Sequence, residues 1–293
     1  MNSRFAVIIL FCSSIGWGLT WLPLKYLNDM GLDSLQLIFI AFTSATVVLL
    51  PWLFRQFSSW KSHTGFMVLI ALTGGLANAS FQTAIYHGDV IRVMILFYML
   101  PVWSVLGGRL FLKEKVDKLR LSAVALCLSG AFVILDVWHN SWSGVNWIDF
   151  LALGSGLGLA TSIILFRFTQ TIPVMSKVSS VFIGCTVLTG LTLLVTPSQA
   201  QLPANNAVIF AGLYGAIWVT LVTLGTQWAV TQMEAGRSSV IIVMELVAAV
   251  ISIALLTEKD LQWTEIIGGL MVLSAALLEG SRNEDTEQAV SMG

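Results

Sequence analysis

The sequence predicts an all-α integral membrane protein, with ten transmembrane helices in two inverted five-helix repeats and both ends of the chain in the cytoplasm. Its 293 residues are 56% hydrophobic and 11% charged, with a mean hydropathy of +0.84. A soluble domain usually has about 25% charged residues. Long apolar runs follow one another along the chain, and two stretches about half a chain apart resemble each other. The first two observations indicate a membrane protein, and the third indicates a duplication.

Ten apolar segments are long enough to cross a bilayer, which takes roughly 20 residues of helix. We predict transmembrane helices at 5–27, 33–54, 65–87, 90–111, 119–138, 147–168, 177–196, 207–231, 237–257 and 263–281. The first run continues past Trp21, so we interpret it as an uncleaved helix rather than a signal peptide. The polar tail, residues 282–293, is expected to be disordered and cytoplasmic.

The distribution of basic residues predicts the orientation. With the N-terminus in the cytoplasm, only Lys25, Arg92 and Lys259 of the 15 Lys and Arg residues fall on the outer side. All the others lie in cytoplasmic segments or at the cytoplasmic ends of spans. Because cytoplasmic loops of membrane proteins carry such an excess of Lys and Arg, we expect both termini inside.

Two pairs of stretches indicate the duplication. LFLKEKVDKLRLSAVALCLSGAFVIL (110–135) resembles LLTEKDLQWTEIIGGLMVLSAALL (255–278), and SFQTAIY (80–86) resembles GTQWAVT (225–231). We predict one five-helix repeat at 1–140 and a second at 145–281. Since five is odd, the repeats would face opposite ways in the membrane. Many transporters are built in this way, with the substrate site near the midplane between the halves.

One position differs between the matching stretches. Pro101 precedes Glu114 by 13 residues, and Glu245 precedes Glu258 by the same number. This spacing aligns a proline with a carboxylate. Pro101 is expected to bend the fourth span, because proline lacks an N–H and its ring clashes with the preceding turn.

Three motifs resemble the drug/metabolite transporter superfamily, in particular its ten-helix EamA-type exporters. They are IGWGLTWLPLKYL (15–27), LPVWSVLGGRLFLKEK (100–115) and TEKDLQWTEIIGGLMVLSA (257–275), and the resemblance covers nearly the whole chain. It implies a multi-pass exporter of the cell inner membrane that works by alternating access. It does not identify the cargo, because such proteins move amino acids, cofactors, amines and drugs.

The ninth span departs from the pattern of this family, which often has Glu-Pro there. Met244, Glu245 and Leu246 include no proline. Local similarity aligns Glu245 with the glutamate of the family if the repeat is shifted by one residue, and we prefer this alignment to the one given by spacing. Without a proline, the ninth span is expected to be straighter than the fourth.

Glu245 is the leading candidate for a binding residue, because a charge deep in a span is costly unless it is paired or hydrated. It would receive a substrate amine or a coupling proton. The alternative is a protonated glutamate that hydrogen-bonds between helices as packing.

Other polar and aromatic residues inside the spans are further candidates. The amides are Asn78, Gln82 and Gln227, of which the last two occupy matching places in the repeats; interhelical packing is the alternative role. Aromatic rings could enclose an apolar group or hold an ammonium, although core packing would explain them equally well. The deep rings are Trp17, Trp21, Tyr86, Tyr98, Trp103, Trp218 and Trp228.

Three charged residues are candidates for gating on the outer side. Arg92 could pair with a substrate carboxylate or with Asp89, and Lys25 could line a cavity. The alternative for Arg92 and Lys25 is interfacial snorkelling.

Several functions find no support in the sequence. It has no catalytic motif, no metal-ligand spacing and no basic stripe for nucleic acid, so we expect no enzyme, no cofactor, no metal and no nucleic-acid partner. We predict a monomeric or homodimeric secondary transporter in the lipid bilayer that exports a small amphipathic metabolite, an amino acid or another amine-bearing compound. The expected energy source is proton coupling or exchange. The alternatives are an exporter of drugs or lipophilic cations and a membrane scaffold without transport.

Overall fold

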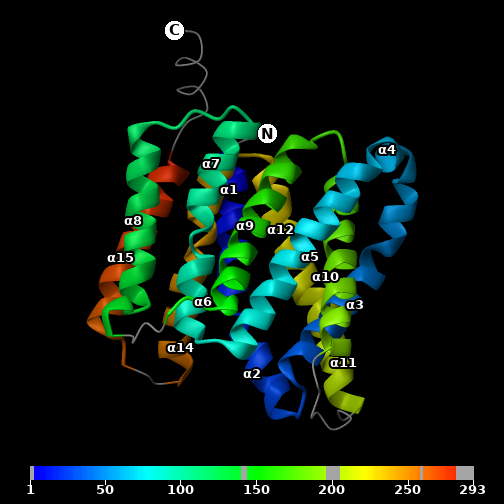
Figure 1. Cartoon of the computed structure of the whole chain (residues 1–293), viewed down its shortest axis with the longest axis horizontal. Helices are drawn as coiled ribbons and strands as arrows, with labels where there is room; N and C mark the ends of the chain where they lie inside the picture. The colour runs from blue at the N-terminus through cyan, green and yellow to red at the C-terminus, as the bar shows by residue number, and fades with distance from the viewer. Residues whose placement is uncertain (1–2, 140–143, 196–204, 258–259, 282–293) are drawn as a thin grey trace.

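The computed structural model describes residues 3–139, 144–195, 205–257 and 260–281, and every regular element in these ranges is a helix (Figure 1). In chain order the elements are α1 (Ser3–Gly18), α2 (Trp21–Asp29), α3 (Ser34–Arg55), α4 (Phe57–Trp60), η1 (Lys61–His63), α5 (Thr64–His87), α6 (Val90–Phe97), α7 (Leu100–Phe111), α8 (Lys118–Ile134), η2 (Val137–His139), α9 (Trp147–Phe168), α10 (Val174–Val195), α11 (Asn205–Leu213), the π-helix η3 (Tyr214–Val219), α12 (Thr220–Thr231), α13 (Ala235–Ile242), α14 (Met244–Thr257) and α15 (Trp263–Gly280).

Nine helical spans in the described ranges are long and apolar enough to cross a membrane. They are Arg4–Asp29, Ser34–Arg55, Phe57–Ile85, Val90–Phe111, Trp147–Phe168, Val174–Val195, Asn206–Thr231, Ala235–Thr257 and Trp263–Gly280. The tenth predicted span, 119–138, corresponds to α8, which has 17 residues and packs against α15. The predicted all-helical membrane architecture is therefore confirmed. The predicted tail, 282–293, lies outside the described residues.

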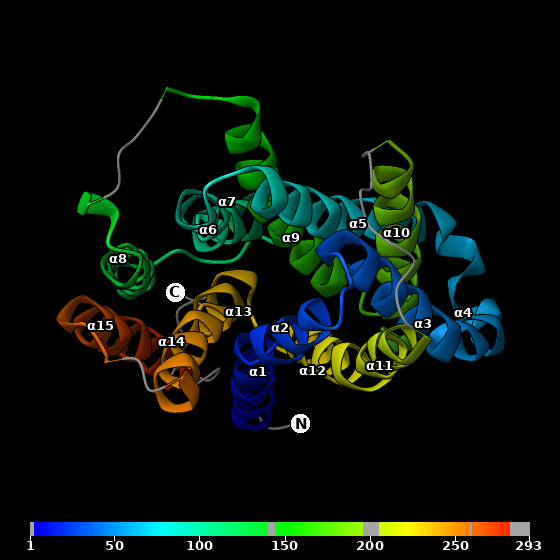
Figure 2. The same cartoon turned by 90° about the horizontal axis from the view of Figure 1, so that it is seen from below.

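The helices form a bundle that is elongated in cross-section (Figure 2). At one edge α8 packs against α15, and at the opposite edge α10 packs between α3 and α5. Between these edges α1 packs against α12 and α14, and α9 packs against α5, α6 and α7. The fourth and ninth spans meet where α7 contacts α13.

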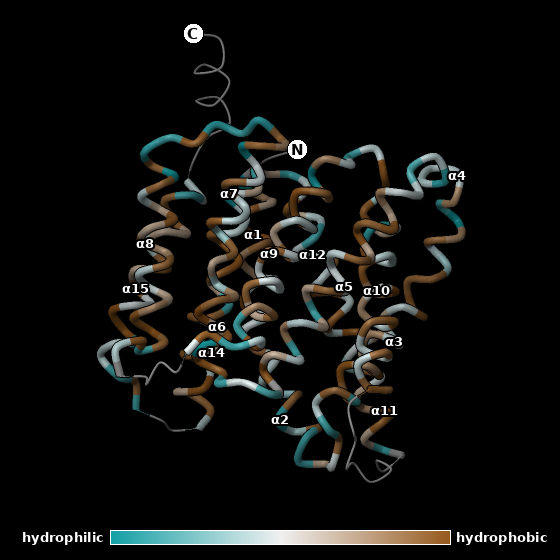
Figure 3. Tube along the Cα trace, in the orientation of Figure 1, coloured by the Kyte–Doolittle hydropathy of each residue, from teal (hydrophilic) through white to brown (hydrophobic). Residues whose placement is uncertain are grey.

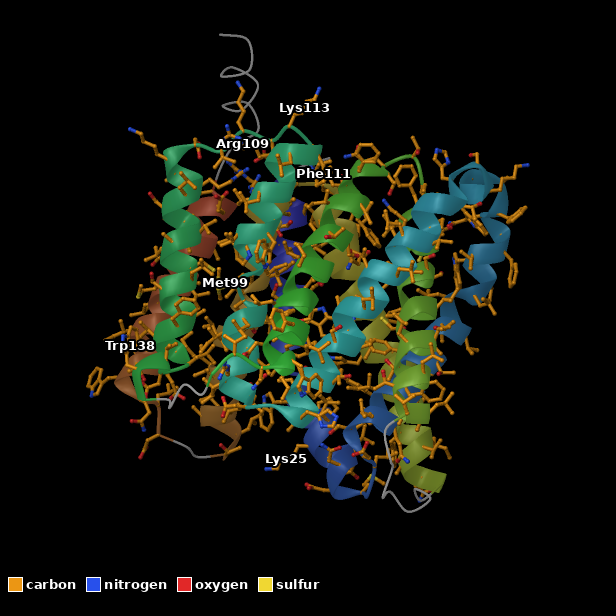
Figure 4. The ribbon with its side chains drawn as sticks, in the orientation of Figure 1. Lys25, Met99, Arg109, Phe111, Lys113 and Trp138 are labelled. Carbon is orange, nitrogen blue, oxygen red and sulfur yellow. The ribbon has the colours of Figure 1, made fainter. Side chains whose placement is uncertain are left out.

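Hydrophilic residues gather at the two ends of the bundle, as expected for a chain that spans a membrane (Figure 3). We call one end the Arg120 end: α7 finishes there, α8 begins there, and the N-terminus lies there. The other is the Arg92 end, where α6 begins. Figure 4 shows Lys113 at the Arg120 end and Lys25 at the Arg92 end.

Short polar side chains determine where several helices begin. Asp33, Asp89 and Asp117 each precede a helix and accept a hydrogen bond from a backbone N–H of its first turn, at 2.9 to 3.1 Å. Asn146 and Asp149 form a capping box at the start of α9. These contacts satisfy N–H groups that have no partner within a helix.

Three spans are interrupted near their middle. The first breaks between Gly18 and Trp21, the fourth at Tyr98 and Met99, and the ninth at the single residue Val243. Figure 4 places Met99 about midway between the two ends. We expected the ninth span to be straighter than the fourth. It is also interrupted, but by one residue, whereas the fourth span is interrupted by two. A proline is not required for this break.

Candidate functional site

The breaks of the fourth and ninth spans are joined by a hydrogen bond. The Tyr98 hydroxyl donates to Oε1 of Glu245 over 3.1 Å. Tyr98 directly follows α6 as its C-cap residue and is only 3% exposed, whereas Glu245 is the second residue of α14 and is half-buried. A carboxylate in the first turn of a helix is stabilised by the unpaired N–H groups there. The sequence predicted both residues as site residues, and the fold brings them together across the two halves of the chain.

Pro101 occupies the same position in α7 that Glu245 occupies in α14. Each is the second residue of the helix that follows a break. The two residues therefore hold corresponding positions in their helices, as their spacing predicts.

Two glycines allow other helices to approach these breaks closely. A Cβ on Gly18, the last residue of α1, would collide with the carbonyl oxygen of Glu245. A Cβ on Gly156 in α9 would lie 2.6 Å from the carbonyl oxygen of Phe97, the last residue of α6. Since real Cβ atoms do not approach other atoms so closely, only glycine fits at these positions.

Three tryptophans lie on the interrupted spans and on the π-helix. The Trp21 indole N–H, at the start of α2, donates to Ser252 Oγ of α14 over 2.9 Å. The Trp218 indole N–H, in η3, donates to the Gly16 carbonyl oxygen over 3.2 Å. Trp103, one turn into α7, is half-buried, and its buried indole N–H has no hydrogen-bond partner among the described residues. π-Helical turns occur frequently at functional sites.

The remaining predicted polar residues are not joined to Glu245 by any contact of the described residues. Gln227 is 5% exposed, and its Oε1 has no partner in the described part of the chain. Asn78 donates to the Gly74 carbonyl oxygen of its own helix over 2.9 Å, and Gln82 is half-buried.

Three other predicted aromatic residues are not joined to the Tyr98–Glu245 pair by any contact of the described residues. Trp17 is half-buried against the hydrophobic core. Trp228 stacks edge-on against Phe5 near the start of α1, with ring centroids 5.9 Å apart, which places it toward the Arg120 end. The side chain of Tyr86 lies outside the described part of the structure.

The predicted pairing of Arg92 with Asp89 needs correction. The Asp89 carboxylate caps α6 by accepting from the backbone N–H of Arg92, at 2.9 Å. The Arg92 guanidinium instead pairs with Asp149 of α9, at 2.6 Å, and also donates to the Gly144 carbonyl oxygen. Asp149 was not among the predicted site residues, although its place three residues after Asn146 marks a capping box. Lys25 is exposed, as an interfacial anchor would be.

A second charged cluster lies at the Arg120 end and was also missed. Arg120 pairs with Glu234 and Glu279, and Glu114 pairs with Arg167. Burial raises the pKa of Glu114, as does the nearby Glu234 carboxylate, while the Ala235 backbone N–H and the two arginines act in the opposite direction. Charges near span ends usually belong to the membrane boundary, and for this reason the sequence did not indicate a cluster.

The described residues contain no group of three or more His, Cys, Asp or Glu side chains placed to hold a metal ion. The most distinctive polar contact near the middle of the bundle is thus the Tyr98–Glu245 pair, at two helix breaks. Helices interrupted near the midplane are typical of membrane transporters, whose binding sites use the exposed helix ends.

Comparisons with known proteins identify the kind of transporter. Residues 4–136 match the model of the EamA-like transporter family. The chain is 26% identical to a riboflavin transporter of Brucella anthropi over 69% of each chain. It is 24% identical to a riboflavin transporter of Vibrio cholerae, over 72% of this chain and 67% of that one. An uncharacterized transporter of Bacillus subtilis, YojE, is 32% identical over 45% of this chain and 47% of its own.

The fold also matches a crystal structure with a TM-score of 0.76 and 14% identity, over 95% of this chain and 98% of that chain. The first part of the chain thus matches the EamA-like transporter family, and the resemblance to this family seen in the sequence is confirmed. The spans and the transporter relatives together indicate a multi-pass membrane transporter.

Proposed function

We propose that this protein moves a small amphipathic metabolite with an amine group across the inner membrane, and that the cargo binds at Glu245. The observation that carries the proposal is the half-buried carboxylate at the break of the ninth span, held by the Tyr98 hydroxyl. A carboxylate in this place favours a cationic group or another strong hydrogen-bond donor. The rings of Trp21 and Trp103, on neighbouring interrupted spans, would contact the apolar part of the cargo.

Alternating access would arise from two inverted repeats, 1–140 and 145–281. The pattern of helix contacts supports this arrangement: α5 packs on α9 as α12 packs on α1, and α8 packs on α15. The matched breaks at Tyr98 and Val243 support it as well. With the basic residues concentrated at the Arg120 end, we place that end in the cytoplasm. The proposal includes export driven by protons or by exchange, which transport assays at different pH values and with cargo on the opposite side would test.

A second candidate cargo is riboflavin, because two relatives are named riboflavin transporters. Riboflavin carries no ammonium group, so Glu245 would accept from one of its hydroxyl or ring N–H groups instead. Aromatic side chains would stack on its rings. The two cargoes thus predict different consequences for neutralising Glu245.

The test is a ligand screen by thermal unfolding of detergent-purified protein, followed by uptake into liposomes. The panel contains amino acids and their amine derivatives, polyamines, choline-like cations, organic dyes and riboflavin. A ligand at a hundred times its Kd stabilises the folded state by about 2.7 kcal/mol. We expect an amine to raise the Tm of the wild-type protein but not that of Glu245→Gln.

The matched control is Glu265→Gln, which changes an acid to an amide in the capping box of α15 and should keep full ligand response. Riboflavin that stabilises both the wild type and Glu245→Gln would favour the flavin cargo and remove the amine proposal. A panel in which nothing binds and nothing is transported would contradict both cargoes.

A further inference from the structure

At the Arg120 end, a buried arginine connects three helices. Arg120, in the first turn of α8, is 1% exposed and pairs with Glu234, the residue before α13. Its Nε atom lies 3.4 Å from Oε1 of Glu279, which is fully buried near the end of α15. A buried charge is stable only when partners compensate for its lost hydration. Both carboxylates therefore help to keep this arginine inside the protein.

A second charged contact runs beside the first. Glu114 follows α7 and accepts hydrogen bonds from the backbone N–H of Ala235, at 2.9 Å to Oε1 and 3.1 Å to Oε2. It also pairs with Arg167 Nε at 3.2 Å. Ala235 is the first residue of α13, so this carboxylate lies at a helix N-terminus, where negative charge is favoured. The fourth and ninth spans are thus joined here by the carboxylate that follows α7, while Glu234 joins α13 to Arg120.

Beside these contacts, α7 and α13 are closely packed. A Cβ on Gly236 of α13 would lie 2.7 Å from Cγ2 of Val105 in α7. At the opposite end, the Arg92–Asp149 ion pair joins α6 to α9. Since α9 packs on both α6 and α7, this ion pair adds to the contact between the fourth and sixth spans. It does not connect the fourth span to the ninth.

We propose that Arg120, Glu234 and Glu114 form a latch that closes the Arg120 end by holding the end of the fourth span and the start of the fifth span against the ninth. A path from the Tyr98–Glu245 pair to that end requires α7 and α8 to separate from α13, and this separation breaks these contacts. The latch concerns the conformation of the protein and not its cargo. Its test measures accessibility, so the result stands whether or not the proposed cargo is correct.

The experiment uses two serines as positions for cysteine reporters. Ser104 in α7 is fully buried and lies one turn before Gly108, whose Cβ would be 3.6 Å from that of Ala235. Ser162 in α9 is 1% exposed and lies one turn after Gly158, which packs on α5. Neither serine hydroxyl has a partner among the described residues, so Ser→Cys removes no known hydrogen bond.

Each reporter is placed in full-length protein whose native Cys12, Cys127 and Cys185 are replaced, and is labelled in detergent with a water-soluble maleimide. Glu234→Gln weakens the latch while Arg120 retains Glu279. The matched control is Asp149→Asn, the same acid-to-amide change at the other ion pair, where Arg92 retains the Gly144 carbonyl.

We expect Glu234→Gln to raise the labelling rate of the Ser104→Cys reporter by about tenfold or more, because lost contacts shift the population toward the open state. Asp149→Asn should leave this rate unchanged, and the Ser162→Cys reporter should stay unreactive in both variants. Equal rates for Glu234→Gln and its parent would overturn the proposal.

Rapid labelling of the Ser162→Cys reporter would show that Glu234→Gln unfolds the protein. In that case the Glu234→Asp variant provides the test of the latch. It keeps the negative charge beside Arg120 but shortens the side chain by one methylene group. A folded Glu234→Asp variant with faster labelling of the Ser104→Cys reporter supports the latch, and a folded variant with the parental rate overturns it.

Discussion

The fourth and ninth spans are interrupted at matching places, but different residues follow the two breaks. Pro101 is the second residue of α7, and Glu245 is the second residue of α14. Proline suits a first helical turn because its missing N–H would have no partner there, and a carboxylate suits it because of the helix dipole. The same backbone position thus accepts either residue. The first half of the chain therefore has a helix break without a charge, whereas the second half has a helix break followed by a negative charge.

The strongest test of this comparison is to give the ninth span the residue of the fourth. Glu245→Pro should fold, because proline is tolerated in a first turn, but should reduce transport to background because the carboxylate is lost. Uptake into liposomes and the Tm of the same preparation measure the two effects. The matched control is Val247→Pro, two residues further into α14, where proline costs about 3 kcal/mol or more. A Glu245→Pro variant that transports normally would remove Glu245 from the mechanism.

A smaller effect is expected at the glycines that contact each break. Gly18→Ala and Gly156→Ala should each lower stability by about 1–3 kcal/mol, because an added methyl group overlaps a backbone carbonyl. Gly154→Ala is the control, since no heavy atom lies within 4 Å of its Cβ position. Thermal unfolding of the three variants compares them. If only one of the first two variants is destabilised, the two breaks are not equivalent in packing.

Tyr98→Phe sharpens the comparison further, because it removes the hydroxyl that joins the two breaks and keeps the ring. A hydrogen bond to a charged partner contributes about 1.5–3 kcal/mol. We expect transport to weaken by about ten- to a hundredfold, mainly through KM, with a small change in Tm. The result would contradict the proposed role of Tyr98 if transport kinetics were unchanged.

The smallest effect is expected at Glu114, in the segment after α7. Its pKa is raised in the folded protein, so the folded state holds the proton more tightly than the unfolded state does. This contribution to stability is present at low pH and is lost as the pH rises above about 4.3, the ordinary value for glutamate. The Tm of the wild type relative to Glu114→Gln should therefore fall between mildly acidic and neutral pH. A difference in Tm between the two proteins that does not change with pH would contradict the raised pKa of Glu114.

Much of the architecture could be predicted from the sequence because apolar runs of sufficient length must be helices in a bilayer. The ends of most spans agree with the structure within a few residues. Glu245 was found for the same reason, since a charge within such a run stands out. Its partner Tyr98 was one of several deep aromatic residues, and no local pattern shows which of them meets a carboxylate from the other half of the chain.

Other features could not be read from the sequence because they depend on contacts between distant segments. The break at Val243 has no proline or glycine to mark it. The burial of Arg120 and Asp149 depends on how the spans pack. Pairs of charges far apart in sequence become visible only when the fold is known.

The packing of α10 has a consequence for motion. A Cβ on Gly184 would collide with the Ala71 carbonyl of α5, and a Cβ on Gly75 of α5 would lie 2.6 Å from the Gly184 carbonyl carbon. Two backbones in direct contact cannot slide or rotate past each other without collision, because no flexible side chain lies between them. This edge of the bundle would act as a fixed hinge. Any opening would then increase with distance from this edge.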